Sequence, residues 1–181
     1  MLPIGPLMIE HRLIERMIRQ IERNIDSMRT KGAADVLFID TAVDFIRTYA
    51  DKFHHGKEEE ILFRDLAGKK ISTEHNRIMG ELIEEHVFGR KTTKELVDAK
   101  ERYINKDKTA LKDIIQKLET LVQFYPKHIE KEDRHFFIPV MDYFSSAEKG
   151  KMLEEMNEFE KNFTQVRYMS VVEGVEKGSR A

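Results

Sequence analysis

Two short stretches of the sequence place a glutamate four residues after a histidine. The first pair is His54 and Glu58, and the second is His128 and Glu132. Residues four positions apart lie on the same face of an α-helix, so each pair would present an imidazole beside a carboxylate. These two groups together are typical ligands of iron, manganese and zinc. A single pair is also common as a surface hydrogen bond, so its interpretation depends on where the helices place it.

The elements that would carry these pairs are four long helices. Apolar side chains recur at steps of three and four residues, which predicts amphipathic helices over residues 7–29, 34–66, 73–103 and 108–143. Short polar turns separate these segments. Four long helices with short connections predict an all-α fold, an antiparallel up-down-up-down four-helix bundle.

A further helix is predicted after this bundle. Ser145 and Glu148 form the pattern of a capping box, and the helix would run from about residue 147 to about residue 172. It would cover one face of the bundle or form the contact of a homodimer. We therefore expect one domain over residues 1–181, with the bundle at about residues 7–143.

Polar side chains interrupt the apolar stripes of all four helices. Burying an unpaired imidazole or carboxylate is unfavourable, and a carboxylate especially so. Counted from the turns at about 1.5 Å per residue, four histidines fall within one or two helical turns of a single layer. Two carboxylates in that layer would bridge two metal ions, each bound by two imidazoles and left with open positions for a small ligand. The predicted ligands are His11, His54, Glu58, His86, His128 and Glu132.

Two further histidines lie on the same stripes but too far along their helices. His75 is about 16 Å from His86 by helical rise, near a turn, so we expect a structural or helix-capping role. His135 is about 10 Å beyond His128 and is expected in the core or at the rim of the bundle.

Residues beside the predicted ligands are assigned other roles. His55 is turned by about 100° from His54 in an α-helix, which favours support of a ligand or a surface position. Tyr125 lies one turn before His128 and would be part of the core or line a pocket. The acidic residues expected to be solvated are Glu59, Glu60, Glu130 and Asp133.

The bulk composition limits the class of protein. Hydrophobic residues make up 40% of the 181 residues, charged residues 35%, and the formal net charge is −2, which fits a globular protein with a charged exterior. This balance gives no argument for binding nucleic acid or an anionic membrane. The absence of cysteine excludes thiolate ligands and a cysteine nucleophile. No apolar run is long enough for a membrane span or a signal peptide, so we expect a cytoplasmic protein.

Four stretches resemble one known family, the hemerythrin-like or HHE cation-binding domain. They are "EHRLIERMI", "HHGKEEEILF", "EEHVFGR" and "HIEKEDRHFFIP", within about residues 7–143. The resemblance implies two non-haem iron ions in a four-helix bundle, held by the six predicted ligands and bridged by the two glutamates, with zinc or manganese as substitutes. Oxygen-carrying members have a fifth histidine paired at four residues on the third helix. Here Leu82 and Arg90 stand at those distances from His86, so the fifth imidazole is missing unless His75 or another residue enters through a bent helix.

Several functions are compatible with these residues. The leading hypothesis is a di-iron protein that binds or reacts with oxygen, peroxide or nitric oxide, including a peroxide- or nitric-oxide-consuming oxidoreductase. The second is an oxygen, redox or iron sensor, or an iron store, without turnover. A ferritin-like di-iron carboxylate protein is a third, although only Glu132 and His135 have the Glu-x-x-His spacing of that fold. A metal-free helical adaptor is the fourth.

Overall fold

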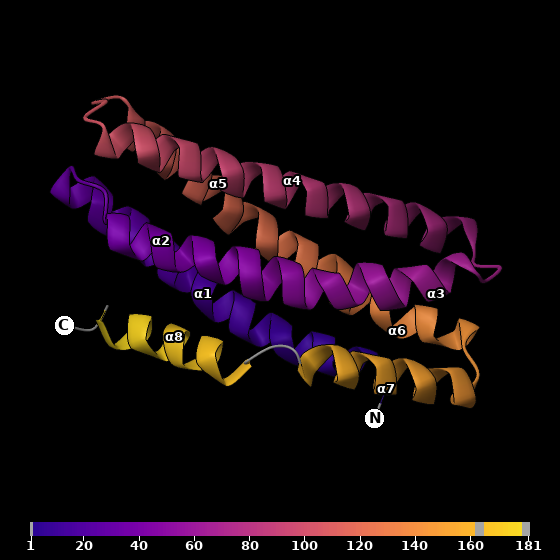
Figure 1. The fold of residues 1–181 in the computed structure, drawn as a ribbon. Helices are drawn as coiled ribbons and strands as arrows, with labels where there is room; N and C mark the ends of the chain where they lie inside the picture. The colour runs from indigo at the N-terminus through magenta and orange to yellow at the C-terminus, as the bar shows by residue number, and fades with distance from the viewer. Residues whose placement is uncertain (1, 162–164, 179–181) are drawn as a thin grey trace.

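The computed structural model describes residues 2–161 and 165–178, and all regular elements within them are helices (Figure 1). In chain order the helices are α1 (Ile4–Lys31), α2 (Val36–Asp44), α3 (Arg64–Ala67), α4 (Thr73–Ile104), α5 (Ala110–Lys131), α6 (Phe137–Val140), α7 (Ser146–Lys161) and α8 (Gln165–Gly178). The predicted all-α bundle with additional helical structure after it is confirmed.

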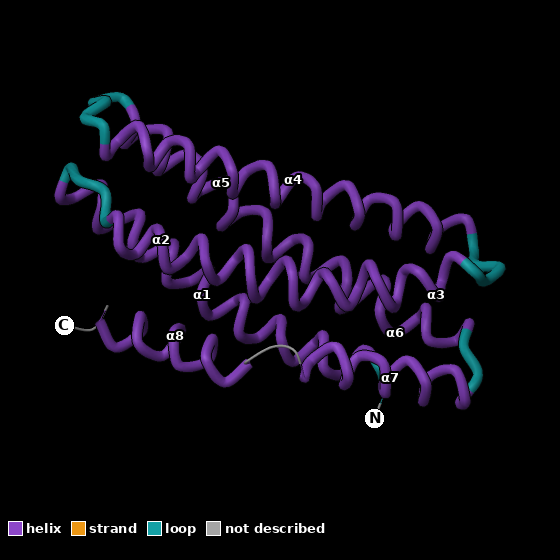
Figure 2. The backbone as a smooth tube through the Cα atoms, in the orientation of Figure 1, coloured by secondary structure: helices purple, strands orange, loops and turns teal. Residues whose placement is uncertain are grey.

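The bundle has four rods, by which we mean uninterrupted helical stretches of the chain. The second and fourth rods contain π-helical as well as α-helical segments. α2 continues into α3 through two π-helical segments, Phe45–His55 and Glu58–Phe63. α5 continues through a third, Glu132–Phe136, into α6 and a 3-10 turn at Met141–Tyr143. Figure 2 shows these rods as continuous tubes beside α1 and α4. π-helical segments are rare and often occur at functional sites. These three contain half of the predicted ligands, namely His54, Glu58 and Glu132.

The helices begin and end at the capping and turn residues expected from the sequence. Gly32 ends α1 in the left-handed conformation, with φ of 65°, which glycine adopts without steric cost. The hydroxyl of Ser72 accepts a hydrogen bond from the amide of His75 and caps α4. The predicted capping box before α7 is confirmed, because the Ser145 amide bonds the Glu148 carboxylate at 2.8 Å and the Glu148 amide bonds the Ser145 hydroxyl at 3.3 Å.

The apolar core is divided into two halves. One half contains Ile14 and Ile21 of α1 with Leu118 of α5. The other contains Leu7 of α1 and Leu82 of α4. Along each rod the predicted ligands lie where one group gives way to the other, so the predicted layer lies between two apolar regions.

The C-terminal part differs from the single helix predicted over residues 147–172. Two helices are described there, α7 and α8, on either side of residues 162–164 (Figure 1). Each packs on a different half of the core: Met152 and Met156 of α7 join one half, and Tyr168 and Val172 of α8 join the other.

Within residues 2–161 and 165–178, none of the helices combines the length and the hydropathy of a membrane span.

Candidate metal centre

The structure brings the six predicted ligands into one buried layer. Each comes from the rod on which the sequence places it. All are at most 2% exposed: His11, His54, Glu58, His86, His128 and Glu132.

Glu58 lies between two histidines of different rods. One of its carboxylate oxygens is 3.1 Å from Nε2 of His54, and the other is 3.3 Å from Nε2 of His86. A carboxylate in this position can bind one metal ion through each oxygen.

Glu132 lies between the imidazoles in the same way. Its Oε2 is 3.2 Å from Nε2 of His11, and its Oε1 is 3.3 Å from Nε2 of His128. The Nε2 atoms of His11 and His54 are themselves 2.9 Å apart. The layer thus contains two histidine pairs, His11 with His54 and His86 with His128, and each glutamate directs one oxygen toward each pair.

The buried atoms at the centre of the layer lack ordinary partners. Within the described residues, both carboxylate oxygens of Glu58 and of Glu132, and Nε2 of His86 and of His128, accept or donate no hydrogen bond. Carboxylates without partners in an apolar interior are strongly unfavourable. Metal ions between the two pairs would satisfy these atoms, so the residues present fit a di-metal group.

Each of the four predicted ligand imidazoles forms a hydrogen bond through Nδ1 with a carboxylate outside the centre of the layer. The Nδ1 bonds are His11 to Asp133 at 2.8 Å, His54 to Glu10 at 2.8 Å, His86 to Glu59 at 2.7 Å and His128 to Glu85 at 2.8 Å. Such a bond fixes the tautomer and the ring orientation of a metal ligand, and leaves Nε2 for the metal.

These supporting carboxylates revise two predictions and add two residues. Glu59 and Asp133 were expected to be solvated, but each bonds a ligand histidine of a neighbouring rod. Glu10 and Glu85 were not predicted at all. The signal was present: each of the four stands directly beside a ligand in the sequence and reaches across to a ligand on another helix. Glu60 and Glu130 are exposed, as expected.

Each supporting carboxylate is in turn paired with a cation. The cations are Arg12 for Asp133, Lys57 for Glu10, Arg90 for Glu59 and Lys131 for Glu85. Lys57 differs from the others because its side chain is completely buried. It also bonds Glu160 of α7 at 2.8 Å, so a buried chain of charges joins α7 to His54.

Aromatic rings shield the layer from water. Three ligand imidazoles lie against phenylalanine rings at centroid distances of 5.3 to 6.0 Å. The stacked pairs are His11 with Phe137, His86 with Phe63 and His128 with Phe124. A low-dielectric surrounding strengthens the electrostatic interactions within the layer.

The carboxylates raise the pKa of three imidazoles, those of His11, His54 and His86. Burial lowers the pKa of His54, but the charge of Glu58 and the hydrogen bonds to carboxylates outweigh it and raise this pKa to about 10. Burial also opposes the charged form of His86, yet the nearby carboxylates of Glu132 and Glu58 raise its pKa to about 11. Metal binding at these nitrogens would therefore release protons.

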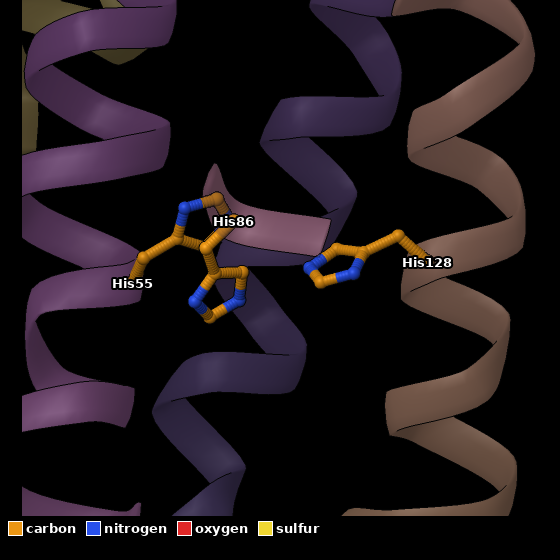
Figure 3. A group of neighbouring side chains, drawn as sticks. All are labelled: His55, His86 and His128. Atoms are coloured by element: carbon orange, nitrogen blue, oxygen red, sulfur yellow. The ribbon is translucent and has the colours of Figure 1, made fainter. Parts of the chain in front are cut away.

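The other histidines separate into two groups. His75 hydrogen-bonds the hydroxyl of Tyr143 at 2.8 Å near the start of α4, which agrees with a structural role. His135 is exposed, which leaves the rim rather than the core as its place. His55 departs from its prediction, because it is only 3% exposed and its ring lies in the layer against His86 (Figure 3). Burial and the charge of His86 lower the pKa of His55 well below its usual value, so this imidazole is neutral.

A cavity of about 100 Å³ lies on the His86 side of the layer. Asp51, His55, Arg90 and Tyr125 line it together with His86. Tyr125 is 2% exposed, and burial raises the pKa of its hydroxyl, so the group remains a hydrogen-bond donor. Tyr125 thus fits both expectations, since it belongs to the core and lines a pocket.

Comparison with known families adds an independent observation about this chain. The family described as Hemerythrin HHE cation binding domain matches residues 2–139. The chain belongs to this family. The matched part of the HHE domain contains all six predicted ligands and the four supporting carboxylates, while α7 and α8 lie beyond it. No curated protein and no solved structure matches the chain.

Proposed function

We propose that this HHE domain is a non-haem di-iron protein that binds or reacts with a small oxidant such as oxygen, hydrogen peroxide or nitric oxide. The observation that carries the proposal is the placement of Glu58 and Glu132. Each carboxylate directs one oxygen to each of two histidine pairs, which is the arrangement that two bridged metal ions need.

The donor set supports iron as the metal. Imidazole nitrogen and carboxylate oxygen suit iron, manganese and zinc, and no thiolate is present to favour softer ions. Zinc binds such sites but has no redox chemistry of its own. When bound, iron supplies the redox chemistry and the open coordination positions, and the protein supplies the ligands and the dry surroundings.

Residues around the predicted ligands orient them for metal binding. The four supporting carboxylates orient the imidazoles, with cations behind them to balance the charge. Phenylalanine rings exclude water from the layer, and the hydroxyl of Tyr125 provides a donor in the cavity next to His86.

The size of the cavity supports a small ligand. A cavity of about 100 Å³ is far below the roughly 300–1,000 Å³ of sites for larger organic ligands. Arg90 and Asp51, whose side chains bond each other at 2.8 Å, stand on the more exposed side of this cavity. A diatomic molecule or peroxide fits the volume.

One feature favours sensing without turnover as a second candidate. The chain of charges from Glu160 through Lys57 and Glu10 reaches His54, so α7 contacts the support of a predicted ligand. A change at the metal centre would alter this chain and could be transmitted to α7. A ferritin-like site is disfavoured, because His135, which completes the Glu-x-x-His pattern, is exposed.

The test is the optical response of iron-reconstituted full-length protein. Azide, peroxide or nitric oxide should produce a new ligand-to-metal absorption band, which His54→Ala should lose and His75→Ala should retain. Steady-state consumption of peroxide or nitric oxide would favour the oxidoreductase, and a spectral change without consumption would favour the sensor. No response to any of these ligands would contradict the proposal.

A further inference from the structure

We propose that His55 is a fifth imidazole ligand, bound to the metal position of His86 and His128, so that the two positions are chemically unequal. This inference rests on the proposed di-metal centre. His55 is not among the six residues predicted from the sequence as ligands, and the structure places it beside two of them.

The backbone explains how two adjacent histidines can both face the core. In a regular α-helix successive side chains are about 100° apart, so His54 pointing inward would turn His55 to the side. Phe45–His55 is π-helical, with hydrogen bonds that reach one residue further and a smaller turn per residue. Both histidines are buried as a result, His54 at 0% and His55 at 3% exposure.

The three rings converge on one space. The ring of His55 stacks on His86 with centroids 3.9 Å apart and lies edge-on to His128 at 5.5 Å. Figure 3 shows the three imidazoles extending from three different rods into the same interior region. One ring nitrogen from each can be chosen so that all lie within 4.8 Å of one another. Nitrogens that share one ion through bonds of about 2.1 Å lie closer than this. To direct its nitrogen at the same ion as His86, the ring of His55 would turn out of its present stacked orientation, in which the two ring planes are 12° apart.

His55 also repeats the arrangement that supports the other imidazoles. Its Nδ1 lies 3.4 Å from a carboxylate oxygen of Asp51, and Arg90 bonds the same oxygen at 2.8 Å. Each of the four predicted histidine ligands has this sequence of Nδ1, carboxylate and cation. In every case the remaining nitrogen, Nε2, is the one left for a metal ion.

The consequence is a difference between the two metal positions. One would have the imidazoles of His11 and His54, and the other those of His55, His86 and His128. The carboxylates of Glu58 and Glu132 each have one oxygen near a histidine of either position. The position with three imidazoles should hold its ion more tightly, because it has one more nitrogen donor.

The experiment is a titration of metal-free full-length protein with cobalt(II), followed by its visible absorption and by competition with a chelator. Wild type should bind two ions per chain. His55→Leu should weaken one of them by at least about 10-fold and change the absorption of that ion, since the loss of even a supporting residue of a ligand has this effect. His135→Gln, at an exposed histidine, is the matched control and should behave as wild type.

The outcomes separate this inference from the proposed function. If wild type binds no cobalt, the di-metal centre itself is wrong. If wild type and His55→Leu both bind two ions with equal affinities and spectra, only the role of His55 is wrong. Should the variant fail to fold, proton NMR of cobalt-loaded wild type decides: exchangeable imidazole protons shifted by cobalt should come from five histidines, and four would overturn the inference.

Discussion

Replacing Lys57 by methionine removes a completely buried cation that supports a predicted ligand. The ammonium group bonds Glu10 and Glu160 and lies 4.0 Å from the centre of the Phe53 ring. Methionine keeps an unbranched apolar side chain in this place but has no charge. The carboxylate of Glu10, itself 1% exposed, would keep only its bond to His54.

The expected decrease in the free energy of unfolding follows from the burial of both Lys57 and Glu10. Removing one member of a buried ion pair costs about 3–5 kcal/mol when the charge left behind is uncompensated, and the protonated imidazole of His54 beside Glu10 offsets part of this cost. Glu160→Gln removes only the outer, partly exposed partner of Lys57, and such pairs contribute about 0.2–1 kcal/mol. The double variant Lys57→Met with Glu10→Gln has no unpaired buried charge, so it should recover most of the loss.

Urea unfolding of the metal-free proteins at neutral pH, followed by circular dichroism, gives these free energies. Lys57→Met should be the least stable of the set, and Glu160→Gln should lie close to wild type. The reasoning fails if Lys57→Met loses less than about 1 kcal/mol, the value typical of an exposed pair. It also fails if the double variant is as unstable as Lys57→Met alone.

Two further predictions concern pH and the supporting carboxylates. The pKa values of His54 and His86 are raised to about 10 and about 11 from 6.5, so their contribution to the stability of metal-free protein is complete below about pH 6.5 and is lost as the pH rises toward these values. Thermal unfolding should show Tm falling over this range, less so with iron bound, and a flat profile without metal would contradict the assignment. Glu59→Gln should loosen His86 and weaken metal binding about 10–100-fold, while Glu60→Gln at the exposed neighbour should not. Chelator competition measures the metal affinities of the Glu59→Gln and Glu60→Gln variants. Equal affinities in the two variants would show that the bond from Glu59 does not support His86 as a ligand.

The helices and the polar layer could be predicted from the sequence because the positions of their residues follow helical periodicity. His11, His86 and the two His-x-x-x-Glu pairs stand where Leu or Ile would continue the apolar stripe. Counting residues from the turns was sufficient to place them near one height, since rise per residue changes little among helices.

The features that the sequence did not predict depend on the direction in which a side chain points around its helix axis and on contacts between different rods. His55 was set aside because an α-helical angle was applied to a π-helical segment. Glu10 and Glu85 stand beside predicted ligands but support histidines on other rods, so spacing within one helix does not show which imidazole each of them bonds. The buried position of Lys57 likewise depends on Glu160 of α7, a contact between residues that are far apart in the sequence.

The central claim is that two metal ions share Glu58 and Glu132, and anomalous diffraction at the iron edge from crystals of iron-loaded full-length protein tests it most directly. The account predicts two peaks, one against His11 and His54 and the other against His86 and His128, with both glutamates contacting each peak. A single peak, or two peaks with no carboxylate in common, would contradict it.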